Sequence, residues 1–170
     1  ADGRVLDYSI VVANADTTTV YNKLITGKVK KLRRERAKLA KADPSLAGFS
    51  LLLGLRPSEN PTGLSHHNIF FPDDYDAEFG DIFDRKQPVQ DPTIYLCAPQ
   101  DESMVKHSGH EAWFVLVNAP RHDLQDGFNW NDADFNHRYA MQIIDSLESR
   151  GISIRDRLEV LEIRTPADLE

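Results

Sequence analysis

Two apolar runs joined by a polar loop most constrain the fold of this chain. The first run covers residues 48–56 and the second covers residues 64–71. The loop over 57–63 contains two prolines and a glycine, so we expect the runs to form adjacent strands of one sheet. The first run is apolar at successive positions, which predicts a central strand covered on both faces.

The rest of the chain shows the periodicities of an α+β fold. Alternating or continuous apolar runs predict further strands, and apolar residues at helical spacing predict helices. Because several strands follow one another through short loops, we expect a mainly antiparallel sheet with helices packed on one face. The expected strands cover 4–13 (a hairpin or two short strands), 93–98, 112–119 and 158–163, and the expected helices cover 17–25, 28–42, 73–85 and 131–149.

Composition bounds the class of protein. The chain has 170 residues, of which 41% are apolar and 28% charged, as in an ordinary globular domain with a substantial core. No apolar run approaches the roughly 18 residues that a membrane-spanning helix needs, and we see no signal-peptide pattern. Cys97 is the single cysteine, which excludes an internal disulfide and a cysteine-cluster metal site. We therefore expect a cytoplasmic location.

The charge is unevenly distributed. Residues 28–42 carry eight Lys or Arg and one Glu, a local +7, which leaves −14 for the rest of a chain whose net charge is −7. A basic helix on an acidic body suggests an anionic partner or a membrane surface. The same pattern is typical of a solvated face that pairs with the protein's own acidic surface. Nucleic-acid binding is disfavoured, because the acidic remainder opposes it and no aromatic residues interleave the charges.

His66 and His67 stand at the entrance of the second apolar run. Adjacent residues of a strand point to opposite faces, so at most one should enter any given pocket. Further ligands for a metal are not near in sequence, since His107 and His110 lie in a different loop. The sequence therefore predicts no metal site. It favours a single histidine in a substrate cavity or in a structural hydrogen bond.

Sequence motifs of catalysis are missing. There is no Gly-x-Ser-x-Gly, no cysteine beside a histidine in the sequence, and no glycine-rich phosphate loop. Cys97 falls in an apolar strand and is expected in the core. No catalytic residue can be named from these patterns.

An ordered series of motifs nevertheless resembles the carotenoid (phytoene) desaturase-type, FAD-dependent oxidoreductases. The series begins with Val11-Val12-Ala13-Asn14-Ala15-Asp16. The resemblance then continues through Gly48-Phe49, Leu53-Gly54-Leu55, His66-His67-Asn68-Ile69, Asp74-Tyr75, Asp91-Pro92-Thr93-Ile94-Tyr95, Gly109-His110-Glu111, Ala119-Pro120, Asn129-Trp130 and Ile163-Arg164-Thr165-Pro166. The stretch 101–109 departs from the family pattern, because it is longer and lacks the family's prolines.

The resemblance implies a fragment of a larger flavoenzyme. Residues 1–16 would be residual strands of the FAD-binding domain, with Asn14 and Ala15 near the flavin, and 17–170 would be a single compact substrate-binding domain. We expect FAD in the full-length protein, none in this chain, and an inactive isolated chain. The substrate would be a long apolar polyene or related lipid, oxidised by hydride transfer to flavin. The residues expected to line its cavity are His66, His67, Phe70, Tyr95, Trp113 and Val115.

Two further expectations concern partners. Proteins of this family are typically peripheral on membranes, which makes 28–42 a candidate for membrane contact. An isolated domain would also expose its former interface, which would allow a homodimer of the isolated domain. The alternative interpretation is a non-catalytic interaction module that binds an anionic partner or a membrane surface through the basic helix 28–42.

Overall fold

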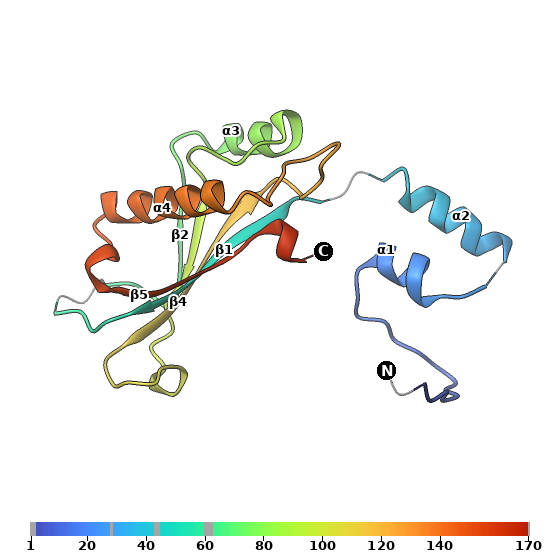
Figure 1. Cartoon of the computed structure of the whole chain (residues 1–170), viewed down its shortest axis with the longest axis horizontal. Helices are drawn as coiled ribbons and strands as arrows, with labels where there is room; N and C mark the ends of the chain where they lie inside the picture. Colours follow the sequence, from blue (N-terminus) through green and yellow to red (C-terminus); the bar gives the residue numbers. More distant parts are fainter. Residues whose placement is uncertain (1–2, 28, 43–44, 60–62, 170) are drawn as a thin grey trace. The chain divides into compact units, whose positions relative to one another are not determined.

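The chain divides into two compact units. The computed structural model describes residues 3–27, 29–42, 45–59 and 63–169. The first unit comprises residues 1–44 and the second 45–170 (Figure 1). The sequence predicts a boundary at 16/17, whereas the structure divides the chain between 44 and 45. The assignment of 1–16 to an FAD-binding domain stays a prediction, and its first two residues lie outside the described ones.

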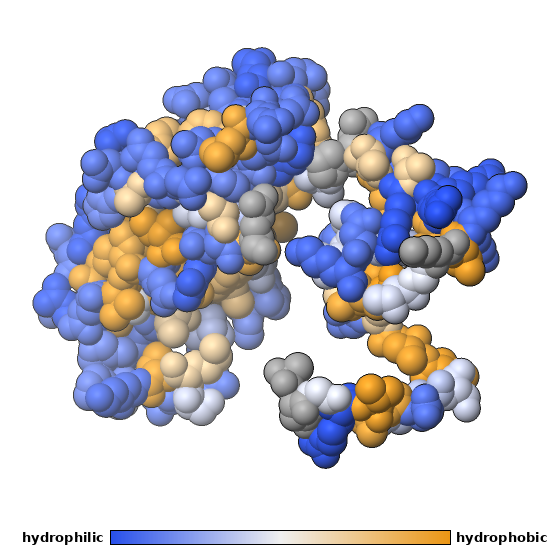
Figure 2. All heavy atoms as spheres, turned by 45° about the vertical axis from the view of Figure 1, so that its right-hand side comes forward, coloured by the Kyte–Doolittle hydropathy of each residue, from blue (hydrophilic) through white to orange (hydrophobic). Residues whose placement is uncertain are grey.

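The first unit begins with an extended apolar segment. The prediction of strands over 4–13 is wrong, because these described residues form no strand and no described segment pairs with them. Val5, Ile10 and Val12 are 89%, 82% and 87% exposed. Figure 2 shows hydrophobic atoms uncovered along this unit. A strand needs a neighbouring strand to satisfy its backbone hydrogen bonds. Residues 4–13 have the apolar composition of a strand, but no described strand lies beside them.

Two helical segments complete the first unit. The expected helix over 17–25 is present as α1 (Thr17–Thr19) followed by a π-helix, η1 (Val20–Leu24), with the Asp16 carboxylate accepting from the Thr19 amide at 3.0 Å. The basic helix is α2 (Lys30–Leu39), and Lys28 of the predicted range lies outside the described residues. The Arg36 guanidinium donates to the carbonyls of Tyr21 and Ile25, which ties α2 to η1.

The second unit is built on one antiparallel sheet. Its strands are β1 (Ala47–Leu55), β2 (His67–Phe70), β3 (Ile94–Cys97), β4 (Glu111–Ala119) and β5 (Leu158–Arg164). Their order is β2-β3-β4-β1-β5, and every neighbouring pair is antiparallel. The prediction that the two apolar runs are adjacent strands is wrong. The first run forms β1, which pairs with β4 along nine residues, whereas the second forms β2, which is four residues long and pairs with β3. Residues 60–62 of the predicted loop lie outside the described ones.

Helices lie on one side of this sheet (Figure 1). The predicted helix over 73–85 is confirmed as α3 (Tyr75–Phe79) and the π-helix η2 (Gly80–Arg85), capped by Asp74. The helix predicted over 131–149 is confirmed as α4 (Ala133–Ser149), capped by Asp132, and Gly151 adopts the left-handed conformation just beyond it, with φ of 83°. Short 3₁₀ turns are η3 (Glu102–Met104), η4 (Arg155–Arg157) and η5 (Pro166–Leu169). The α+β class is thus confirmed.

The core lies between α4 and the sheet face that it covers. Alternate residues of β1 from Phe49 to Leu55 are buried there, and Phe49 makes ring contacts with Trp130 at 5.3 Å and Tyr139 at 5.0 Å between centroids. The buried residues that share this cluster are Phe49, Leu51, Leu53, Leu55, Ile94, Leu96, Ala98, Trp113, Val115, Val117, Ala119, Trp130, Tyr139, Ala140, Ile143, Ile144, Leu147, Ile152 and Ile154. We call this side of the sheet the covered face.

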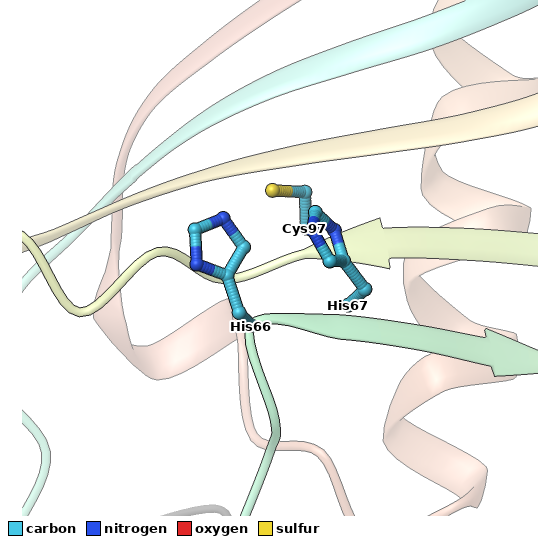
Figure 3. A group of neighbouring side chains, drawn as sticks. All are labelled: His66, His67 and Cys97. Atoms are coloured by element: carbon cyan, nitrogen blue, oxygen red, sulfur yellow. The ribbon is translucent and has the colours of Figure 1, made fainter.

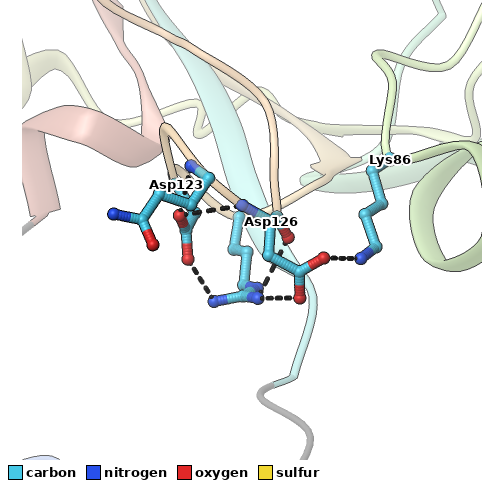
Figure 4. Close-up of polar contacts among 5 residues, drawn as sticks. Lys86, Asp123 and Asp126 are labelled. Carbon is cyan, nitrogen blue, oxygen red and sulfur yellow. Dashed lines mark hydrogen bonds and ion pairs between the residues drawn. The ribbon is translucent and has the colours of Figure 1, made fainter.

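A polar network fixes the loop that leads from β4 into α4. The Arg121 guanidinium binds the carboxylates of Asp123 at 2.8 Å and Asp126 at 2.9 Å, and Lys86 pairs with Asp126 (Figure 4). The hydrogen bond from Lys86 lowers the pKa of Asp126, and the amides of Gln125 and Asp126 lower that of Asp123. These contacts hold the loop that carries Trp130 into the core.

Candidate functional site on the open face of the sheet

The second face of the sheet, which we call the open face, is exposed or half-buried and largely apolar. On β1, Leu52 points here and is 37% exposed, although it lies between the fully buried Leu51 and Leu53. The prediction that this strand is covered on both faces is therefore wrong. Strand register places two rows across the open face: His67, Cys97, Phe114, Leu52 and Glu162 in one, and Ile69, Tyr95, Leu116, Ser50 and Arg164 in the other.

The centre of the open face is apolar and its edges are polar. Tyr95 and Phe114 meet edge to face with ring centroids 6.3 Å apart. Along β5, Glu162 and Arg164 form an ion pair at one edge, and the His67 imidazole stands on β2 at the other. Such an arrangement, an apolar floor with a few polar groups at its rim, suits a long apolar ligand more than a polar one.

His66, His67 and Cys97 form a compact cluster at the β2 edge. One donor atom from each side chain lies within 4.8 Å of the others (Figure 3). The rings of His66 and His67 are 4.3 Å apart between centroids. The two side chains do not point to opposite faces as expected, because β2 starts at His67 and His66 precedes the alternation of the strand. Of the two histidines, His66 lines the adjoining cleft.

Tyr95 holds one of these histidines in place. Its hydroxyl lies 2.8 Å from Nδ1 of His67. Partial burial, together with the neighbouring Cys97 thiol, raises the pKa of the Tyr95 phenol. Tyr95 therefore stays a neutral hydrogen-bonding group across the physiological range. The predicted residues His67 and Tyr95 thus share the open face, with His66 beside them.

Three other predicted cavity residues lie on the covered face. Trp113 is 2% exposed and Val115 is fully buried in the core, while Phe70 is half-buried and packs against the same cluster. The Trp113 indole donates to the Glu111 carboxylate at 2.9 Å and lies under the buried Arg157 guanidinium. The alternation of β2 and β4 turns these three side chains toward α4, away from the open face.

Asn14 and Ala15 belong to the first unit. Both are exposed and directly precede Asp16, the cap of α1. Their predicted place near a flavin stays a prediction.

The apolar residues of the open face were not predicted as site residues. Leu52, Phe114 and Leu116 fall on alternate positions of two strands, and that alternation is visible in the sequence. A continuous apolar run hides it, because the buried and open faces then carry the same residue types. Cys97 was expected in the core for the same reason, and it is half-buried on the open face.

A cleft adjoins the cluster beside His66. It has a volume of about 690 Å³ and is lined by Ser65, His66, Gln100, Asp101 and Glu102. A second cleft of about 430 Å³ also includes Asp101 and Glu102 and reaches His110 and Glu111. The loop that departs from the family pattern thus lines the surface next to the histidines.

Within the described part of the chain, none of the helices combines the length and the apolar character needed to cross a bilayer.

Comparison with known proteins identifies relatives over nearly the whole chain. No family model matches the sequence. The chain is 31% identical over 177 residues to a phytoene desaturase (lycopene-forming) of Pseudescherichia vulneris, an alignment covering 99% of this chain and 33% of that protein. It is 29% identical over 171 residues to hydroxyneurosporene desaturase of Rubrivivax gelatinosus, covering 100% of this chain and 31% of the relative.

The name of a third relative refers to an oxygenase and not to a desaturase. The chain is 29% identical over 172 residues to 4,4'-diaponeurosporene oxygenase of Staphylococcus haemolyticus, covering 99% of this chain and 32% of that protein. The chain thus spans about a third of the length of these curated relatives. The resemblance predicted from the motifs is confirmed: this chain belongs, by sequence, to the carotenoid and phytoene desaturase-type proteins.

Proposed function

We propose that the second unit is the substrate-binding part of an FAD-dependent oxidoreductase that acts on a carotenoid or a related long polyene. In this proposal the open face forms one wall of the cavity that holds the polyene. The flavin would accept the hydride, and this chain would supply the apolar wall and the polar groups at its rim. The isolated chain would be inactive.

The observation that carries the proposal is the uncovered apolar centre of the sheet. Leu52 and Ile69 are 37% and 57% exposed, and Val160 is 56% exposed, on strands whose opposite face is a packed core. Burying such surface is worth about 25 cal/mol per Å², so an apolar sheet face is normally covered. The names of the relatives refer to carotenoids, whose long hydrocarbon chains match such a surface.

The residues of this chain do not fit FAD by themselves. The sequence holds no glycine-rich dinucleotide fingerprint, and Asn14 and Ala15 are exposed on a loop before α1. We therefore place the FAD-binding residues mainly in other parts of a longer protein. The exposed apolar segment 4–13 supports this, since it has the composition of a strand and would find its neighbours in such a domain.

The proposal is tested by placing a charge in the middle of the open face. In the full-length protein, Leu52→Arg should weaken polyene binding by about 100-fold, because the charge would have to be buried beneath the ligand. The matched control is Leu124→Arg, which changes a 70% exposed leucine of the loop after β4. Binding is measured by the shift of the polyene absorption spectrum. Equal affinities of the two variants would contradict the proposal.

The polar rim is tested separately. His67→Ala and Tyr95→Ala remove the hydrogen-bonded pair at the β2 edge and should each weaken polyene binding by about 3- to 10-fold, as expected for one lost neutral hydrogen bond and some contact area. Unchanged affinity in both variants would remove these two residues from the proposed site and leave the apolar wall to be tested by Leu52.

Membrane contact is a second proposal, carried by α2. Lys30, Lys31, Arg33 and Arg34 are all exposed on this helix. Each basic residue near an anionic bilayer is worth about 1 kcal/mol, and this attraction is screened by salt. Reversing these four charges to Glu should abolish sedimentation with vesicles that contain phosphatidylserine. Binding that persists in the charge-reversed protein or at high salt would contradict an electrostatic role for α2.

A further inference from the structure

The cluster of His66, His67 and Cys97 has the composition of a transition-metal site. Two imidazole nitrogens and one thiolate sulfur are the ligands that Zn²⁺ and copper ions prefer, and protein sites with three such ligands leave a position for a further ligand. The three donor atoms already lie within 4.8 Å of one another. Donors about 2.0–2.3 Å from a common ion lie roughly 3.3–3.8 Å apart, so the proposed site requires the three side chains to move closer together by rotation.

The sheet holds two of the three ligands in register. His67 on β2 and Cys97 on β3 are direct cross-strand partners, and both point to the open face (Figure 3). His66 is held next to them because its carbonyl accepts from the Ala98 amide at 2.8 Å. The pairing of β2 with β3 and the bond from Ala98 to His66 therefore fix the backbone positions of His66, His67 and Cys97.

Tyr95 supplies the outer contact that metal-binding histidines usually have. Its hydroxyl is hydrogen-bonded to Nδ1 of His67 at 2.8 Å, which leaves Nε2 as the nitrogen available to a metal. His66 and His67 are exposed and Cys97 is half-buried, so an ion can reach the cluster from solvent. Asp101 and Glu102 line the adjoining cleft with His66 and provide a negative potential at its mouth.

We propose that His66, His67 and Cys97 bind one Zn²⁺ ion, with water or a cleft side chain as the fourth ligand. The ion would sit at the β2 edge of the open face. This inference does not depend on the proposed polyene function, because the ligands, their spacing and their accessibility are properties of the second unit alone.

Zinc binding is measured by titration calorimetry on the reduced full-length protein, first stripped with a chelator. One equivalent of Zn²⁺ should bind. Cys97→Ser, His66→Gln and His67→Gln should each weaken binding by about 100-fold or more, since even outer contacts of a metal site are worth about 10- to 100-fold. His107→Gln is the matched control, because His107 and His110 form a comparable ring pair, 5.4 Å between centroids, elsewhere in the same unit.

X-ray absorption of the zinc complex gives a second readout. The spectrum should contain one sulfur at about 2.3 Å and two imidazole nitrogens at about 2.0 Å, and the sulfur should disappear in Cys97→Ser. Circular dichroism of each variant confirms that the sheet is retained. The proposal is overturned if the reduced protein binds no zinc, if the three ligand variants bind as tightly as the wild type, or if His107→Gln loses as much affinity as they do.

Discussion

The two faces of the five-stranded sheet are made of similar residues but have different surroundings. On β1, Leu51 and Leu53 are 0% and 2% exposed beneath α4, while Leu52, between them, is 37% exposed. On β4, Trp113 and Val115 are buried, while Phe114 and Leu116 are half-buried. The open face therefore presents exposed or half-buried apolar side chains on β1 and β4, as a binding wall requires and a solvated face does not.

The sharpest way to break this comparison is to truncate neighbouring leucines of β1. Leu51→Ala should lower the free energy of unfolding by about 2–5 kcal/mol, because it leaves a cavity in a close-packed core. Leu52→Ala should cost less than about 1 kcal/mol, since its side chain is not enclosed. Both values come from urea unfolding followed by circular dichroism. Similar losses for the two variants would show that the open face is covered too.

A smaller difference is expected between Trp113 and Phe114. Trp113→Phe removes the indole bond to Glu111 and weakens the contact with Arg157, which should cost about 1–3 kcal/mol because Arg157 is buried. Phe114→Leu, on the open face, should cost less than about 1 kcal/mol. The same unfolding experiment decides between them, and a larger loss for Phe114→Leu would reverse the assignment of the faces.

Acid should weaken the fold through carboxylates whose pKa values are lowered in the folded chain. Burial would raise the pKa of Asp81, but hydrogen bonds from Gln87 and Arg85 outweigh it and lower that pKa, and the pKa values of Asp123 and Asp126 are lowered as well. A carboxyl group whose pKa is lower in the folded than in the unfolded chain stabilises the fold at pH values above the unfolded pKa of about 3.9. This stability is lost as the pH falls from that value through the lowered pKa of the folded chain.

Melting temperatures measured from pH 7 to pH 3 should therefore fall below about pH 4. Asp126→Asn should make the decrease shallower, because it removes one of the titrating groups, while Asp156→Asn, outside this network, serves as the control. A decrease of the same steepness in Asp126→Asn would exclude the Lys86–Asp126 contact as a contributor.

The sequence predicted the helices and most strands because their signals are local. In the structure, Asp16, Asp74 and Asp132 cap α1, α3 and α4, and Gly151 adopts the left-handed conformation just beyond α4. Strand order was not predicted correctly, because β1 pairs with the long strand β4, which is distant in sequence, and not with the short strand β2 that follows it. Nor could local patterns show that β3 brings Cys97 to the two histidines, since that proximity depends on the pairing of residues about 30 apart in sequence.

Of the predicted cavity residues, the structure separates two groups. His66, His67 and Tyr95 lie together at the open face, whereas Phe70, Trp113 and Val115 face α4 or the core. Alternation assigns residues of one strand to two sets, but it does not say which set α4 will cover. That choice follows from the whole core, in which Trp130 and Tyr139 pack on Phe49.

The most direct test of the open face as the polyene wall uses Cys97 as a reporter. The rate of alkylation of Cys97 is measured by peptide mass spectrometry in the full-length flavoprotein, with a chelator present, before and after saturation with a polyene. Cys97 lies between His67 and Phe114 on the open face, so bound polyene should slow its alkylation by about tenfold or more, since such ligands are mostly enclosed by their site. An unchanged rate at saturating polyene would contradict the assignment of this face to the substrate.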